Sequence, residues 1–69
     1  MLVEKRVFSA TEAAVILGVS THTVYQYLAT GALVGFKFPG HNAWRITEDA
    51  LLDFLHRQEM GMIEKMRNN

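Results

Sequence analysis

The first run of apolar residues at helical spacing lies near the N-terminus, over residues 10–17. Ser9 and Glu12 have the spacing of a capping box, in which each side chain bonds the backbone amide of the other residue. Gly18 follows the last apolar residue and suits the left-handed conformation that commonly ends a helix. The pattern therefore predicts a short helix from Ala10 to Leu17.

A second helical pattern begins almost at once, with Ser20 as its candidate N-cap and Gly31 as its candidate stop. Within residues 21–30, Val24 and Leu28 lie four positions apart and predict the buried face. The turn between the two helices is short and contains a glycine, so the helices must cross steeply. The two segments predict a helix-turn-helix.

After Gly31 the side chains follow a period of two, which is typical of strands. This pattern predicts a β-hairpin, or wing, with strands at 33–38 and 43–46 and a turn at 39–42. Alternation places Phe36 and Phe38 on one face and Lys37 on the other. We expect the wing to bury its aromatic residues, including Trp44, and to present Lys37 and Arg45 together to solvent.

Thr47 is a candidate cap for a third helix, with Glu48 and Asp49 at its positive end. The residues expected on its apolar face are Leu51, Leu52, Phe54 and Leu55. The fold class is therefore mainly α with a small β-hairpin, a winged helix-turn-helix of three helices plus a wing. We expect one domain over residues 1–57 and a C-terminal tail over 58–69, which either continues as a helix whose Met62, Ile63 and Met66 pack back or self-associate, or frays.

Composition limits the class of protein. A chain of 69 residues has room for only one small core. Because it contains no cysteine, it forms no disulfide. It contains neither an apolar run of the roughly 20 residues that span a membrane nor a signal peptide at its N-terminus, so we expect a cytoplasmic protein.

The net charge of zero conceals a segregation along the chain. Residues 13–47 contain no acidic residue but hold Lys37 and Arg45, whereas residues 48–69 contain five acidic and three basic residues, a balance of −2. Acid-free stretches also arise by chance in small proteins, so charge alone does not identify a nucleic-acid surface.

The outer stripe of the second helix consists of His22, Tyr25, Gln26 and Ala29. A helix of this kind fits the major groove, where glutamine can pair with adenine and histidine with a purine edge. Hydroxyls at the helix start favour phosphate. The residues predicted to bind DNA are Ser20, Thr21, His22, Thr23, Tyr25, Gln26, Lys37, His41, Asn42 and Arg45.

Simpler interpretations exist for several of these residues. Ser9 and Ser20 are better explained as helix caps than as nucleophiles, and the three histidines show no metal-ligand spacing. Lys37 and Arg45 are either solvated charges or phosphate contacts. We expect Tyr27 to be partly buried against the wing with its hydroxyl at the surface. No pattern in the sequence indicates an enzyme, a cofactor or a metal site.

The order of these segments resembles the excisionase-like, MerR-related winged helix-turn-helix domains, and the resemblance covers residues 7–56. The segments that carry it are Ser9–Ser20, Thr23–Leu28, Gly31–Leu33, Trp44–Ile46 and Glu48–Leu55.

The resemblance implies double-stranded DNA as the partner, with the second helix in the major groove. It also implies that the wing lies along the backbone or minor groove, with Lys37 and Arg45 as backbone contacts. Similar domains act as excisionases beside an integrase, as transcriptional regulators, or as small terminase subunits in DNA packaging, in bacteria, phages and mobile elements. A protein-interaction module on the same fold is the alternative from another class.

Overall fold

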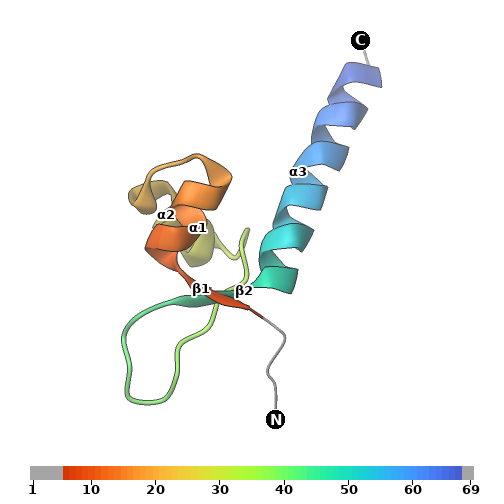
Figure 1. Ribbon diagram of the computed structural model, residues 1–69. Coiled ribbons are helices and arrows are strands. Elements are labelled where there is room, and N and C mark those ends of the chain that lie inside the picture. Colours follow the sequence, from red (N-terminus) through yellow and green to blue (C-terminus); the bar gives the residue numbers. More distant parts are fainter. Residues whose placement is uncertain (1–5, 68–69) are drawn as a thin grey trace.

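The computed structural model describes residues 6–67 and confirms a mainly helical fold with a two-stranded antiparallel sheet. Figure 1 shows α1 and α2 together on one side of the strands, while α3 extends away from them as a single long rod. The elements are β1 (Val7–Ser9), α1 (Ala10–Leu17), α2 (Thr21–Thr30), β2 (Arg45–Thr47) and α3 (Glu48–Arg67).

The first two helices begin and end where the capping residues predict. The Glu12 amide donates to Ser9 Oγ at 3.1 Å, and the Ser9 amide donates to Glu12 Oε1 at 2.9 Å, which completes the capping box. Gly18 and Gly31 end α1 and α2 with φ of 72° and 80°, values that suit glycine because it has no Cβ. Local side-chain to backbone bonds therefore fix both helices and the short turn between them.

The capping box makes stability depend on pH. The hydrogen bond from the Ser9 backbone lowers the pKa of Glu12 below its ordinary value of 4.5, and the Ser9 side chain and the charge of Arg45 add to this. A lowered folded-state pKa means that the carboxylate stabilises the fold fully above pH 4.5, and that this contribution is lost as pH falls through the folded pKa.

We therefore expect Glu12→Gln to be less stable than the parent protein at about pH 7, with the difference narrowing toward about pH 3. Urea unfolding followed by circular dichroism at the two pH values measures it. A difference of the same size at both values would contradict this role of the carboxylate.

The strand pairing differs from the predicted hairpin. β2 pairs with β1 near the N-terminus, with Val7 opposite Thr47, Phe8 opposite Ile46 and Ser9 opposite Arg45. Residues 33–38 do not form a regular strand, since the wing is joined only by an isolated bridge in which Phe36 and Arg45 exchange backbone bonds of 2.8 and 2.7 Å. The returning half of the wing is thus held by β1, because this pairing buries Ile46 in the core.

The first half of the wing passes close over α2 at Gly35. A Cβ built on Gly35 would lie 2.6 Å from Leu28 Cδ2 and 3.2 Å from both the Arg45 carbonyl oxygen and Trp44 Cε3. The Leu28 end can rotate, but the carbonyl belongs to the backbone that pairs with Phe36. Because Gly35 has no Cβ, the chain at this position can lie close to both α2 and the Arg45 backbone.

We expect Gly35→Ala to lower the free energy of unfolding by about 1–3 kcal/mol through overpacking. Gly61 is the matched control, because it lies within α3 and a Cβ added there would meet no atom within 4 Å, so Gly61→Ala is expected to be neutral or stabilising. Thermal or urea unfolding of both variants measures the contrast, and equal stabilities would refute the close approach.

The core is small and entirely apolar among the described residues. It joins α1, α2, the segment after α2, β2 and the first half of α3. Tyr27 is partly buried against the core, as expected. Its ring contact is with Phe54 of α3, with the ring centroids 5.0 Å apart. The buried residues are Ala10, Ala13, Ala14, Val24, Leu28, Leu33, Ile46, Leu51 and Phe54.

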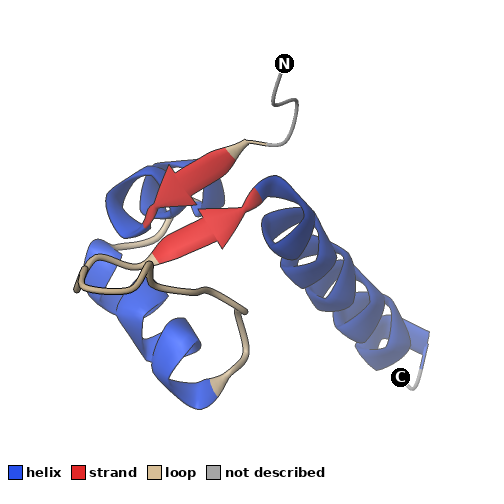
Figure 2. Cartoon of the chain, turned by 90° about the horizontal axis from the view of Figure 1, so that it is seen from below, coloured by secondary structure: helices blue, strands red, loops and turns tan. Residues whose placement is uncertain are grey.

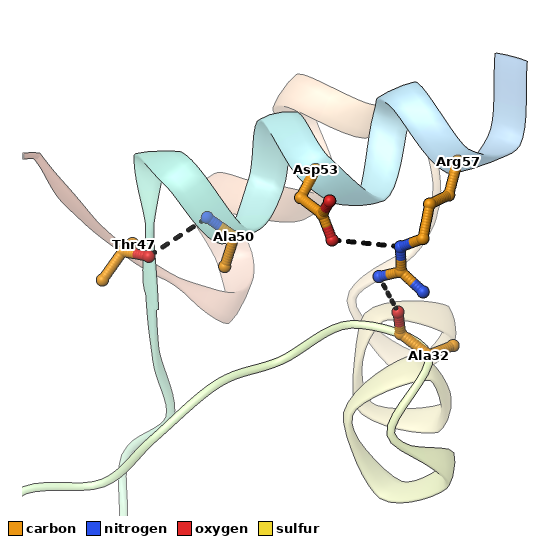
Figure 3. A network of polar contacts seen from close by, with 5 residues as sticks. All are labelled: Ala32, Thr47, Ala50, Asp53 and Arg57. Carbon is orange, nitrogen blue, oxygen red and sulfur yellow. Dashed lines mark hydrogen bonds and ion pairs between the residues drawn. The ribbon is translucent and has the colours of Figure 1, made fainter. Parts of the chain in front are cut away.

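α3 is attached to the rest of the domain at its first half (Figure 3). The Ala50 amide donates to Thr47 Oγ1 at 3.1 Å, which confirms Thr47 as the cap. Arg57 donates through Nε to Asp53 Oδ2 at 3.0 Å and through Nη2 to the Ala32 carbonyl at 2.8 Å. The second bond ties α3 to the segment that follows α2.

The expected apolar face of the third helix is only partly buried. Leu51 and Phe54 enter the core, whereas Leu52 and Leu55 are exposed, because the core contacts only one narrow stripe of α3. The helix continues through Gln58 to Arg67, so the expected boundary at 57/58 falls inside a helix. Asn68 and Asn69 of the predicted tail lie outside the described residues, and within residues 6–67 no helix has the length and apolarity to cross a membrane.

Candidate nucleic-acid interface

The outer face of α2 carries the polar stripe predicted for groove recognition. His22, Tyr25, Gln26 and Ala29 are all exposed, while Val24 on the opposite face is fully buried. Each of the four side chains lies three or four positions from two of the others, so together they form one stripe along the helix. The stripe offers an amide, an imidazole and a phenol, with no acidic side chain to repel phosphate.

The hydroxyl groups at the start of α2 are already engaged with each other. The Thr23 amide donates to Ser20 Oγ at 3.1 Å, and the hydroxyls of Ser20 and Thr23 lie 2.9 Å apart. Thr21 and Thr23 are half-buried, whereas Ser20 is exposed. These residues fix the helix start, and their predicted phosphate contacts stay predictions.

The wing tip is a tight turn that presents polar side chains. Gly40 has a φ of 80°, and the His41 amide donates to the Phe38 carbonyl at 3.0 Å. Lys37, His41 and Asn42 are exposed there. The turn therefore brings an ammonium, an imidazole and an amide to the same loop.

The prediction that Lys37 and Arg45 face solvent together is wrong. The bridge places Phe36, not Lys37, opposite Arg45, and the Lys37 ammonium lies 4.7 Å from the centroid of the Trp44 ring. Arg45 is half-buried and donates through Nη1 to the Trp44 carbonyl at 3.1 Å. Its charge also acts on Glu12 of α1. Lys37 is thus the more accessible of the two cations.

The expected burial of the wing aromatics is also wrong for two of them. Trp44 is half-buried against the core, but Phe36 is 36% exposed and Phe38 is 50% exposed. Their rings meet edge to face with centroids 5.1 Å apart. The core is filled from the helices, Leu33 and Ile46, and neither ring is among the residues that pack against it.

The wing tip and the turn that leads into α2 both lie at the end of the domain away from α3, with the strands between them in Figure 1. In Figures 1 and 2, both are on the left of the molecule while α3 extends to the right. Residues 13–47, which contain both features, hold no acidic residue, and both the stripe of α2 and the wing loop are exposed.

Sequence reasoning missed two kinds of residue. It assigned Phe36 and Phe38 to the core because aromatic residues usually lie there, and only the β1–β2 pairing reveals otherwise. It also gave Arg57 no role, although its spacing of four from Asp53 was a local signal of an ion pair.

Comparison with protein families gives one match. The family described as "Helix-turn-helix domain" matches residues 7–59, which include the wing and every element up to the first half of α3. Searches of curated proteins and of solved structures returned no match. Since the family match covers most of the chain and agrees with the capped helix pair, the protein belongs to the helix-turn-helix domain family.

Proposed function

We propose that the protein binds double-stranded DNA in a sequence-specific way, with α2 in the major groove and the wing against the neighbouring backbone or minor groove. The observation that carries the proposal is the exposed, acid-free stripe on α2 of a helix-turn-helix domain. B-DNA admits one α-helix in its major groove, and the second helix of this motif is the one placed there.

The side chains of the stripe have distinct roles in this proposal. The Gln26 amide pairs with the two major-groove positions of adenine, and His22 bonds to a purine edge. Tyr25 contacts a phosphate or a thymine methyl group. Ala29 is small and exposed, so the helix backbone can approach the DNA closely.

The electrostatic contribution to binding is small in this proposal. Lys37 and Arg45 are the only lysine or arginine residues between residues 13 and 47. Each phosphate neutralised contributes about −0.9 to the slope of log K against log salt, so two contacts give a slope of about −2. Affinity then rests more on base contacts than on the backbone.

Fluorescence anisotropy of a labelled duplex at several salt concentrations tests the proposal. We expect binding with a shallow salt slope, and we expect Lys37→Gln to weaken all duplexes alike and to flatten the slope by about 1. Absence of binding to any duplex at low salt would overturn the proposal.

The biological output we propose is control of recombination, as an excisionase acting with an integrase, or control of transcription. Both outputs need the same groove-reading surface, and the proposal assigns no catalytic step to the protein. DNA packaging beside a terminase uses similar domains. Binding at an attachment site next to an integrase gene supports excision, whereas binding at a promoter supports regulation.

A role in protein association is the second candidate, and one observation favours it. Met62, Ile63 and Met66 lie exposed on the far half of α3, beyond the core contacts. The helix starts with Glu48 and Asp49 and ends with Lys65 and Arg67. Two antiparallel copies of α3 that meet along this stripe would cover the three apolar side chains of each copy.

We expect weak self-association through this stripe, visible as a weight-average mass that rises with concentration in sedimentation equilibrium. Ile63→Glu is expected to restore the monomer mass, because it places a charge in the contact. Val15→Glu is the control, since Val15 is also exposed but lies on α1. A mass that is monomeric at every concentration in the parent protein would exclude the association.

A further inference from the structure

The exposed aromatic pair on the wing is the apolar feature that neither the core nor the proposed groove contacts account for. Phe38 is half exposed, and the edge of one ring meets the face of the other in the pair with Phe36. Phe36 is held by its two backbone bonds to Arg45, so it forms a fixed base from which Phe38 projects near the tip. A small domain that leaves two phenylalanines in water has an apolar surface suited to a partner.

We propose, building on the proposed DNA-binding function, that Phe38 acts as an apolar wedge that enters the minor groove and partly unstacks one base step, with Phe36 as its brace. Proteins that bend DNA from the minor groove commonly insert phenylalanine or another apolar side chain between bases. The minor groove is too narrow for a helix but admits a single loop.

The surroundings of the pair favour DNA over a protein as its occupant. The wing tip and the start of α2 both lie at the end of the domain away from α3 (Figures 1 and 2). Lys37, whose ammonium lies over the Trp44 ring, and Asn42 of the tip turn are exposed on the same loop and can bond phosphate or sugar oxygens while the ring contacts bases. The wing itself carries Lys37 and Arg45 and no acidic residue, and the charge of Glu12 on α1 acts on Arg45 behind the pair.

The wedge also offsets the shortage of cations. Stacking of an aromatic ring on a base does not depend on counterion release, so it adds affinity that salt does not remove. Unstacking costs least at pyrimidine–purine steps such as TA and CA. The wing therefore selects a deformable step at a fixed distance from the bases read by α2, without any hydrogen bond to it.

The test uses the full chain and a duplex enriched by the parent protein from a random pool, with 2-aminopurine placed at its TA or CA steps. We expect a rise in 2-aminopurine fluorescence at one step and a bend of about 20–90° by end-labelled energy transfer. Phe38→Ala is expected to remove both signals and to weaken binding about 10-fold. Phe38→Leu is expected to keep most of the bend, because leucine can also act as a wedge.

Val34→Ala is the matched control, because Val34 is an exposed apolar residue near the start of the wing segment. It should leave the bend and the fluorescence unchanged. If Phe38→Ala binds and bends the duplex as the parent protein does, the wedge is refuted while the DNA-binding function stands. If the parent protein binds no duplex, the proposed function itself fails. Loss of a protein partner in Phe38→Ala with an unchanged DNA bend would assign the pair to protein docking instead.

Discussion

Replacing Leu33 by alanine is expected to lower the free energy of unfolding by about 2–5 kcal/mol. Leu33 has no exposed surface, although it lies in neither a helix nor a strand. Its amide donates to the Tyr27 carbonyl at 3.1 Å, which directs the side chain under the end of α2. The free energy of unfolding of a native domain is only about 0.05–0.15 kcal/mol per residue. A loss of this size is therefore a large share of the total stability of so short a chain.

Urea unfolding followed by circular dichroism measures this loss, and the next residue provides the control. Val34 is 62% exposed, so Val34→Ala is expected to change stability by no more than about 0.5 kcal/mol. If both variants unfold at the same urea concentration, Leu33 is not a core residue and the path of the chain after α2 is different from the one described.

Replacing Gln26 by alanine is expected to weaken binding to the preferred duplex by about 1–3 kcal/mol, which is the discrimination of one bidentate base contact. Binding to random duplex should not change, because Gln26 makes no phosphate contact in the proposed complex. Stability should not change either, since the side chain is exposed on α2. Competition binding with the two duplexes measures the ratio.

Gln58→Ala is the matched control for this prediction. Gln58 is also an exposed glutamine on a helix, but it lies on α3. It should leave both affinities unchanged. An equal loss on preferred and random duplex in Gln26→Ala would mean that the amide contacts the backbone and not a base.

The helices could be predicted because their limits are set by neighbours in the sequence. The Ser9 and Ser20 caps act within three residues, and Gly18 and Gly31 end the helices through their own backbone conformation. No distant contact is needed to read such signals. The exposed stripe of α2 follows from the same local periodicity.

The sheet could not be predicted in the same way. Val7–Ser9 is too short to show alternation, and its partner Arg45–Thr47 lies far along the chain. The predicted hairpin identified the returning strand but paired it with residues 33–38, whereas its main partner is β1. The exposure of Phe38 goes with that pairing, whereas the separation of Lys37 from Arg45 follows from the bridge that places Phe36 opposite Arg45.

The most direct test of groove reading by α2 is selection of random duplexes by the parent protein at low salt, followed by sequencing of the bound fraction. The proposed function predicts one enriched motif, whose adenine position loses its preference when selection is repeated with Gln26→Ala. A bound fraction with the same sequence composition as the starting pool would contradict it.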